Sequence, residues 1–297
     1  MICNMLKDMG IEAKQNFSLK NHISFKIDSI AALAVFPENE SQLCHAVKAV
    51  RESGMRFAVL GNGSNLFFAC EYFDGAVIFT KGMKDMTVDK NKISVLAGAS
   101  FTALSSFALK NGLSGLEFAY GIPGTVGGAV YMNAGAYGGE VSDTLFSSRC
   151  YDITSGEIKE IAREDHSFGY RTSVYMKNDS LLCLGAVFEL EKGSHDEIKE
   201  KMNANMSARR EKQPLEYANA GSYFKRPTGY FAGKLIEDCG LKGYSIGDAE
   251  VSEKHAGFII NKGNATARDI LLLEGEVRRR VYERFGVTLE REVRVIE

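Results

Sequence analysis

A glycine-dense stretch from residue 112 to residue 139 constrains this 297-residue chain more than any other feature. Gly121, Gly124 and Gly127 recur at every third position, and Gly128 doubles the last of them. A tight turn needs one or two residues without a Cβ, whereas close approach of backbone to a flat or charged ligand needs many. The density favours a ligand-binding segment over the alternative, a turn in which backbone packs on backbone.

The peptide N–H groups of this stretch are candidates for binding phosphate oxygens. Pro123 stiffens the segment and removes one donor. A helix beginning near Ala129 would add the positive end of its dipole. The amides expected to meet the anion belong to Gly124, Thr125, Gly127 and Gly128.

A shorter glycine loop, Gly61–Leu66, directly follows an apolar strand expected over 57–60. It is not a Rossmann fingerprint, because Leu66 stands where a third glycine is required and no helix pattern follows. It is not a Walker loop either, since no Gly-Lys-Ser/Thr follows. Two glycines at positive φ could turn the amides toward an anion, with Ser64 and Asn65 donating as well. The alternative is a tight surface turn.

Hydrophobic periodicity predicts an α/β unit over 31–80, an α+β unit over 85–190 and a third unit over 194–297. Helices are expected over 40–53, 101–111, 195–211, 230–239 and from Thr266 to Gly286, with a turn over 71–75. Strands are expected over 57–60, 76–79, 92–97, 181–190 and 288–296, with a hairpin of 149–153 and 157–161.

The charge and the spacing of the cysteines argue against several classes of protein. The formal net charge of −2 gives no basic surplus for nucleic acid. The N-terminal segment shows no signal peptide, and the apolar run 30–36 is too short to span a bilayer. Six scattered cysteines form no C-x-x-C pair and no zinc spacing. We therefore expect reduced thiols, a cytoplasmic protein, no metal, no nucleic acid and no membrane partner.

Ordered motifs over roughly residues 20–297 resemble the UDP-N-acetylenolpyruvoylglucosamine reductase family (UDP-N-acetylmuramate dehydrogenases). A set of such motifs in order is far more specific than any one of them. The short Tyr170–Lys192 spacing is similar to the family's shorter type, which lacks an extra loop bearing a substrate-binding tyrosine. The resembling segments are Gly61–Leu66, Gly112–Gly138, Phe168–Ser173, Ala220–Pro227, Gly233–Glu237, Gly240–Tyr244 and Leu289–Arg294.

The resemblance implies an α+β fold: an FAD-binding fold of the vanillyl-alcohol-oxidase/PCMH type plus a smaller α+β substrate-binding domain. The expected domains are residues 1–82 and 83–193 for FAD and 194–297 for substrate, with the final strand, about 287–297, reaching the active site. One departure is the segment His22–Ser29, where Asp28 and Ser29 replace two family glycines. We therefore expect no FAD contact from this segment.

The resemblance also implies a reaction in two halves. NADPH, the co-substrate, reduces non-covalently bound FAD. The flavin N5 then gives a hydride to the enolpyruvyl methylene of UDP-N-acetylglucosamine enolpyruvate, and protonation of the enolate yields UDP-N-acetylmuramate for peptidoglycan. A monomer is expected. The alternatives are a flavin oxidase of the same fold and a non-catalytic UDP-sugar or flavin-binding regulator.

Site residues follow from the same resemblance. Arg171 would hold the substrate carboxylate, Glu292 would stabilise the enolate, and Ser222 would donate the proton. Arg171 could instead be a surface ion-pair residue, Ser222 a turn serine, and Glu292 part of a solvated strand face with Glu290 as its rival. Substrate contacts are expected from Tyr170, Lys225 and Arg226. FAD contacts are expected from Gly61, Asn62, Gly63, Ser64, Asn65, Leu66, Gly121, Ile122, Pro123, Gly124, Thr125, Gly127 and Gly128.

Overall fold

The computed structural model describes residues 2–297, which group into two compact units. Unit 1 comprises Met1–Gln15, Leu33–Asn62 and Asp74–Ala208, and unit 2 comprises Asn16–Ala32, Gly63–Phe73 and Arg209–Glu297. The chain therefore passes between the units several times. The three-domain division at 82/83 and 193/194 stays a prediction, and its first residue, residue 1, lies outside the described residues.

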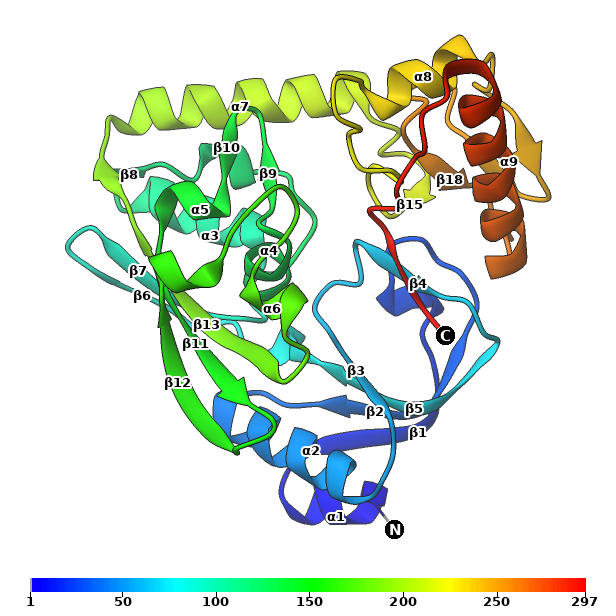
Figure 1. The fold of residues 1–297 in the computed structure, drawn as a ribbon. Coiled ribbons are helices and arrows are strands. Elements are labelled where there is room, and N and C mark those ends of the chain that lie inside the picture. The colour runs from blue at the N-terminus through cyan, green and yellow to red at the C-terminus, as the bar shows by residue number, and fades with distance from the viewer. Residues whose placement is uncertain (1) are drawn as a thin grey trace. The chain divides into compact units, whose positions relative to one another are not determined.

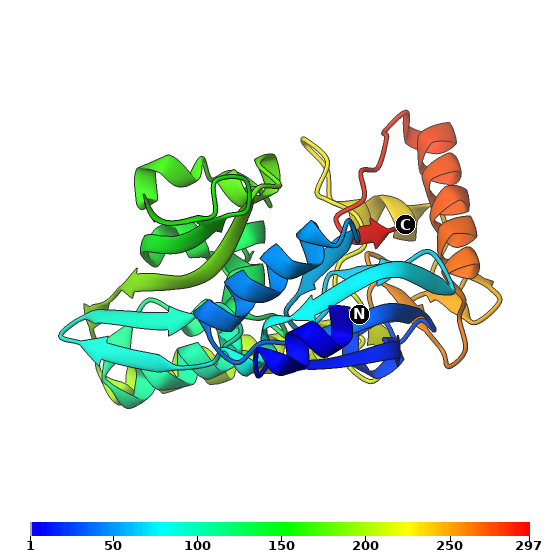
Figure 2. The ribbon, with the colours of Figure 1, turned by 90° about the horizontal axis from the view of Figure 1, so that it is seen from below.

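In unit 1, helices α1 (Ile2–Asp8) and α2 (Glu40–Glu52) lie side by side (Figures 1 and 2). The predicted helix over 40–53 is confirmed. The Asn39 side chain caps it by accepting from Gln42 N–H at 2.9 Å. The apolar stripe of α2 packs into one core with β2 (Ile30–Phe36) and β5 (Tyr72–Phe79).

A four-stranded sheet has the order β1-β2-β5-β3, in which β1 spans Glu12–Ser18 and β3 spans Phe57–Leu60. Strands β3 and β5 run parallel, as expected for an α/β unit. The predicted turn over 71–75 is wrong, because β5 begins at Tyr72. Asp74 and the glycine after it suggested a turn, but Phe73 is buried and the strand continues through them.

The second sheet of unit 1 has five strands in the order β12-β11-β13-β7-β6. The predicted hairpin is confirmed as β11 (Leu145–Asp152) antiparallel to β12 (Glu157–Ala162). Helices α3 (Phe101–Lys110), α4 (Val126–Met132) and α6 (Val174–Lys177) share a hydrophobic core with this sheet (Figure 1). Strands β13 (Leu181–Glu189) and β7 (Lys92–Leu96) match the prediction, whereas β6 (Met86–Asp89) was missed.

Unit 2 contains a four-stranded sheet in the order β15-β18-β17-β16, with helices α8 (Ala232–Asp238) and α9 (Ala267–Phe285). Thr266 caps α9 by accepting from Asp269 N–H, and Gly286 ends it at a φ of +68°. The expected strand over 288–296 is shorter: β19 spans Arg294–Ile296 and pairs in parallel with β4 (Leu66–Phe68).

The remaining elements are short, apart from the long polar helix α7. Within residues 2–297, no helix is long and apolar enough to cross a bilayer. The remaining helices are η1 (Lys20–His22), η2 (Thr80–Gly82), η3 (Glu117–Ala119), α5 (Val141–Thr144), η4 (Arg163–His166) and α7 (His195–Lys212). The remaining strands are β8 (Leu113–Ser114), β9 (Gly135–Ala136), β10 (Gly139–Glu140), β14 (Glu191–Lys192), β15 (Ala218–Asn219), β16 (Ser245–Ile246), β17 (Ala249–Val251) and β18 (Ile259–Asn261).

Candidate functional site

The two glycine segments meet within unit 1. A Cβ built on Gly61 would lie 2.0 Å from Thr125 Oγ1, so only glycine allows this approach. The Asn62 side chain donates to the Pro123 carbonyl at 2.9 Å. Residues that lie some sixty positions apart in the sequence thus lie side by side, and this joins the two predicted cofactor loops into one structure.

The N–H groups of the second segment are less available than the sequence predicted. Gly127 N–H donates to the Ala97 carbonyl at 2.8 Å, and Gly121 N–H donates to Thr102 Oγ1 at 3.1 Å. Helix α4 begins at Val126 rather than at Ala129, and Thr125 is its N-cap. The predictions that Gly127 and Gly128 offer free amides to phosphate are therefore wrong. Gly127 N–H is bound by Ala97 where the helix packs against the strand end, and Gly128 N–H donates to the capping Thr125 Oγ1 at 3.5 Å.

The structural reason for a glycine differs between the neighbouring positions 127 and 128. A Cβ on Gly127 would lie 2.9 Å from the Ala97 Cβ, so this glycine serves close backbone packing. A Cβ on Gly128 would meet only Thr125 Oγ1 at 3.5 Å, which is an ordinary contact. Gly128 is thus the position at which an added Cβ would make no close contact with the protein.

The first loop adopts positive φ at one glycine instead of the two expected. Gly63 has a φ of +59°, whereas Gly61 does not have positive φ. A Cβ on Gly63 would lie 2.8 Å from Ile23 Cγ2, and Ser24 N–H donates to the Gly63 carbonyl at 3.0 Å. Ser24 Oγ also donates to the Asn219 carbonyl at 2.7 Å. The divergent segment His22–Ser29 therefore supports the loop inside unit 2.

Arg171 lies on a tight turn in unit 1. Gly169 and Thr172 exchange two backbone hydrogen bonds of 3.2 Å across it, and Arg171 has a φ of +54°. A non-glycine residue in this region is strained and often marks a functional site. The Arg171 guanidinium donates to the Gly135 carbonyl at 2.9 Å, so the glycine-dense segment holds the side chain.

Asn133 connects the glycine-dense segment to this turn, and sequence reasoning missed it. Asn133 is fully buried and left-handed at the end of α4, with a φ of 44°. Its amide donates to Glu140 Oε1 at 3.0 Å and to the Gly169 carbonyl at 3.1 Å, and its oxygen accepts from Ser142 N–H at 2.9 Å. An asparagine after an apolar helix was the available signal, since asparagine tolerates this conformation.

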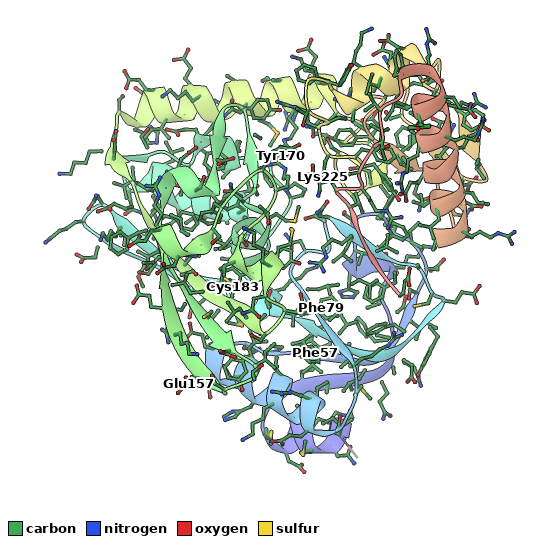
Figure 3. The ribbon with its side chains drawn as sticks, viewed as in Figure 1. Phe57, Phe79, Glu157, Tyr170, Cys183 and Lys225 are labelled. Atoms are coloured by element: carbon green, nitrogen blue, oxygen red, sulfur yellow. The ribbon has the colours of Figure 1, made fainter. Side chains whose placement is uncertain are left out.

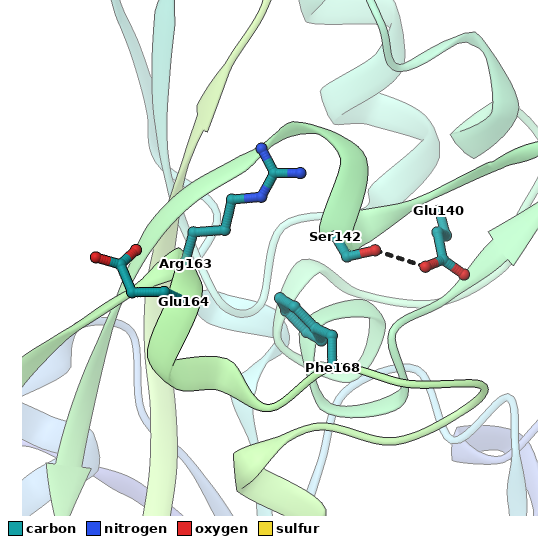
Figure 4. Close-up of a pocket in the computed structure, with 5 residues that line it drawn as sticks. All are labelled: Glu140, Ser142, Arg163, Glu164 and Phe168. Atoms are coloured by element: carbon teal, nitrogen blue, oxygen red, sulfur yellow. Dashed lines mark hydrogen bonds between the residues drawn. The ribbon is translucent and has the colours of Figure 1, made fainter.

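A shallow hollow of about 380 Å³ lies beside this network, lined by Glu140, Ser142, Arg163, Glu164 and Phe168 (Figure 4). Ser142 Oγ donates to Glu140 Oε1 at 2.5 Å, as the dashed line in Figure 4 marks. Glu140 therefore accepts from both Ser142 and Asn133. These contacts give the carboxylate a structural role at the edge of the hollow.

A second buried polar network includes residues that flank the Arg171 turn in the sequence, His166 before it and Tyr175 after it. Ser148 Oγ lies 2.8 Å from His166 Nε2 and 2.6 Å from the Tyr175 hydroxyl. His166 Nδ1 lies 2.7 Å from the Ala162 carbonyl, which assigns the proton to Nδ1 and makes Nε2 the acceptor. Burial lowers the pKa of His166, so the ring is neutral at pH 7. Ser148 and His166 have no exposed surface, so they form a structural network and no accessible nucleophile.

In unit 2 the segments that carry Ser222 and Glu292 are paired. Glu292 N–H donates to the Tyr223 carbonyl at 2.9 Å, and Lys225 N–H donates to the Glu290 carbonyl at 2.8 Å. The Asn65 side chain donates to the Glu292 carbonyl at 3.2 Å. The segments that carry Ser222 and Glu292, far apart in the sequence, thus lie side by side as irregular chain joined by a single β-bridge, with part of the first glycine loop beside them.

The predicted substrate residues lie at the surface. Tyr170, labelled in Figure 3, is 51% exposed, and its ring centroid lies 5.2 Å from the Arg171 guanidinium carbon. Lys225, also labelled there, pairs with the exposed Glu290 at 3.3 Å. The Arg226 guanidinium lies 4.8 Å from the Phe231 ring. Glu290, the rival of Glu292, is therefore bound to lysine at the surface.

The predicted site residues divide between the units. The structure groups Gly61, Asn62, the second glycine segment and Arg171 in unit 1. It groups Gly63, Ser222 and Glu292 in unit 2. Each unit thus contains some of the predicted site residues, and the roles of the individual residues stay predictions.

Comparisons with known proteins match two stretches of the chain to family models. Residues 31–162 match the family described as FAD binding domain, and residues 213–296 match the C-terminal domain of UDP-N-acetylenolpyruvoylglucosamine reductase. The UDP-N-acetylenolpyruvoylglucosamine reductase of Clostridium novyi is 45% identical over 96% of this chain and 92% of its own length. The enzyme from Clostridioides difficile is 44% identical over 99% of this chain and 96% of its own.

Solved structures extend the likeness to the fold. The crystal structure of the reductase (MurB) from Thermus caldophilus superposes with a TM-score of 0.80 at 34% identity, covering 97% of this chain and 99% of that one. Berberine bridge enzyme from Eschscholzia californica reaches a TM-score of 0.50 at 12% identity over 66% of this chain and 44% of its own, a likeness of fold alone.

The FAD-binding domain and the fold that holds it define a flavoenzyme, an oxidoreductase with FAD as cofactor and a fold of the vanillyl-alcohol-oxidase/PCMH type. Identity at this level over almost the whole chain goes further than the class. The chain belongs to the UDP-N-acetylenolpyruvoylglucosamine reductase family.

Proposed function

We propose that this protein reduces UDP-N-acetylglucosamine enolpyruvate to UDP-N-acetylmuramate, with NADPH as the reductant, as a step in the synthesis of peptidoglycan precursors. The observation that most supports this reaction is the pairing of the Ser222 and Glu292 segments, with Glu292 N–H donating to the Tyr223 carbonyl at 2.9 Å. This pairing joins the backbones of the segments that carry the proposed proton donor and the proposed stabiliser, and protonation of an enolate needs a donor and stabilisation of its charge. We further propose a monomer in the cytoplasm.

The residues present fit a flavin nucleotide. Glycine is required at Gly61 by the approach of Thr125, and Gly128 leaves open the space that a Cβ would fill. The thirteen predicted contact residues in Gly61–Leu66, Gly121–Thr125 and Gly127–Gly128 would hold it, although the amides of Gly121, Gly127 and Gly128 already donate to Thr102, Ala97 and Thr125. When bound, FAD supplies the transfer of a hydride from NADPH to the enolpyruvyl methylene carbon.

Arg171 is proposed to bind the substrate carboxylate. Its planar guanidinium can hold a carboxylate with parallel hydrogen bonds, which strengthen as charge builds on the oxygens. The Gly135 carbonyl and the Gly169–Thr172 turn fix the side chain beforehand. Such pre-organisation lets the guanidinium stabilise charge without reorganising during the reaction. Tyr170, Lys225 and Arg226 are proposed to add contacts to the nucleotide sugar.

Ser222 is proposed to protonate the carbon next to the carboxylate, and Glu292 to donate a hydrogen bond to the developing enolate. Serine is a weak acid, so it can act only on a strongly basic carbon centre. Lys225 pairs with Glu290 at 3.3 Å at the surface, which argues against Glu290 as the stabiliser of the enolate. Donation by Glu292 requires that its site keep the carboxyl protonated.

Replacing Ser222 with alanine tests the proposed reaction. Ser222→Ala should leave FAD bound and the reduction of the flavin by NADPH intact, because the serine acts only after the hydride has moved. Reoxidation by the enolpyruvyl substrate should slow by about two to four orders of magnitude. Stopped-flow absorbance measures both half-reactions. Equal slowing of the two, or no slowing of reoxidation, would show that Ser222 is not the donor.

A further inference from the structure

Helix α9 carries one carboxylate among its buried apolar residues. Glu274 lies on the face that buries Leu273 and Val277, and its side chain is 3% exposed. Burying a carboxylate is costly unless charged donors satisfy it, and an apolar residue would pack the helix without that cost. Packing of α9 alone therefore does not account for Glu274.

The donors to Glu274 come from two other segments as well as from α9. Tyr223 donates its hydroxyl to Glu274 Oε2 at 2.9 Å. Arg291 donates to the same oxygen through Nε at 2.8 Å and Nη2 at 2.6 Å. Arg278 reaches Oε1 at 3.5 Å from one turn further along the helix. Burial raises the pKa of Tyr223, and the nearby Glu274 raises it further, so the hydroxyl keeps its proton and remains the donor.

These donors are the sequence neighbours of the two proposed catalytic residues. Tyr223 directly follows Ser222, and Arg291 directly precedes Glu292. The backbone bridge between Phe224 and Arg291 joins the same two segments. One buried carboxylate thus fixes both segments through their side chains, in addition to the backbone pairing.

We propose that Glu274 is a positioning residue that holds Ser222 and Glu292 at a fixed spacing for protonation of the substrate. This proposal rests on the roles proposed above for Ser222 and Glu292. Glu274 acts only through Tyr223 and Arg291. A shift of about 1 Å in a reacting group can cost about a hundredfold in rate, so a loosened anchor should affect this one step selectively.

Glu274→Gln tests the proposal, because it keeps the size of the side chain but removes the charge that satisfies Arg291. Reoxidation of the flavin by the enolpyruvyl substrate should slow by about 10- to 100-fold. Reduction of the flavin by NADPH should stay within about twofold of the wild-type rate. Slowing of both half-reactions by the same factor, or of neither, would overturn the positioning role.

Glu276→Gln is the matched control. It makes the same change on the same helix and removes an acceptor for Arg279 and Arg280. The partners of Glu276 are Arg279 and Arg280, both on its own helix, so both half-reactions should remain at the wild-type rates. If Glu274→Gln fails to fold, Tyr223→Phe removes one hydroxyl from the same network. That variant should slow reoxidation alone by about three- to tenfold, and an unchanged rate of reoxidation would overturn the proposal.

Ser222→Ala separates failure of this proposal from failure of the proposed function. Normal reoxidation in Ser222→Ala would remove the proposed role of Ser222. Slow reoxidation in Ser222→Ala with a normal rate in Glu274→Gln would overturn the positioning role alone. In the double variant, Glu274→Gln should slow reoxidation less than it does in the wild type, because part of its effect passes through Ser222. If Glu274→Gln slowed reoxidation by the same factor in the wild type and in Ser222→Ala, Glu274 would not act through Ser222.

Discussion

At the scale of single residues, the glycines of the two predicted cofactor segments have different structural roles. Gly61 admits the Thr125 side chain, Gly127 admits Ala97, and Gly128 leaves space that no protein atom fills. The sequence shows three similar glycines, but the cost of adding a side chain depends on which atoms lie opposite. Only at Gly128 does substitution test the ligand rather than the packing of the protein.

Gly128→Val should give folded protein with little bound flavin. The added Cβ meets no protein atom closer than Thr125 Oγ1, at 3.5 Å, and the valine side chain would occupy the space proposed for FAD. The ratio of flavin absorbance to protein absorbance in the purified variant measures the loss. Gly275→Val is the control, since Gly275 lies in helix α9 with no heavy atom within 4 Å of a built Cβ. Full flavin content in Gly128→Val would contradict the proposed contact.

Arg171→Lys should lower kcat/KM for the enolpyruvyl substrate by about a hundredfold, or roughly 3 kcal/mol. Lysine keeps the charge but has no planar fork with which to bind Gly135 and a carboxylate together. Reduction of the flavin by NADPH should not change. Steady-state and stopped-flow kinetics measure the two quantities, and Arg163→Lys, at an exposed position, is the control. An unchanged kcat/KM would exclude Arg171 from carboxylate binding.

At the scale of elements, the turn that carries Arg171 is held between η4 and α6. Ser148 on β11, His166 on η4 and Tyr175 on α6 form one buried network. The His166 ring also stacks on Phe168 at a centroid distance of 4.8 Å. Short elements of four residues have little intrinsic stability, so tertiary contacts of this kind must fix them.

The stability of unit 1 should fall when the pH drops below about 6.5, the ordinary pKa of histidine. Because burial lowers the pKa of His166 in the folded state, the unfolded chain binds more protons in that range. The contribution of His166 to the free energy of unfolding is therefore fully present above the pKa of the unfolded state. It is lost as the pH falls through the pKa of the folded state. A single proton gives a slope of at most about 1.4 kcal/mol per pH unit.

Denaturant unfolding between pH 5 and 8 measures this dependence. His166→Gln should have a smaller slope than the wild type, since glutamine can still accept from Ser148 but does not titrate. Burial also lowers the pKa of His255 in unit 2, so part of the slope remains in the variant. Identical slopes in the variant and the wild type would remove His166 as the source.

At the scale of the whole molecule, the chain passes repeatedly between two compact units instead of completing one before the next. The first predicted cofactor loop is divided in the same way. Gly61 and Asn62 belong to unit 1, and Gly63 to Leu66 belong to unit 2. A ligand bound by the folded chain and not by the unfolded chain stabilises the fold by an amount that grows with the logarithm of its free concentration.

Removal of FAD should therefore lower the thermal stability. Free FAD at a hundred times its Kd should add about 2.7 kcal/mol to the free energy of unfolding relative to the apoprotein. Calorimetry of the apoprotein with and without FAD measures the shift. Gly128→Val should show a smaller shift at the same FAD concentration, and light scattering should give the mass of one chain throughout. The absence of any shift in the wild type would contradict FAD binding.

The sequence by itself predicted the helices and strands with strong periodicity and clear ends, such as α2 and α9, because their caps and apolar stripes are local signals. It also identified the family, since ordered motifs over almost the whole chain agree. It failed at the start of β5, where sheet pairing outweighed local turn residues, and at the Gly127 amide, whose acceptor lies thirty residues away.

Only the tertiary structure assigned partners to the side chains. It showed Asn133 as the link between the glycine segment and the Arg171 turn, and it paired Lys225 with Glu290. It also showed Glu274 between the neighbours of Ser222 and Glu292. Helical periodicity places position 274 on the apolar face of α9, but no local pattern shows which donors satisfy a carboxylate there. Its burial and its donors depend on segments that meet only when the chain folds.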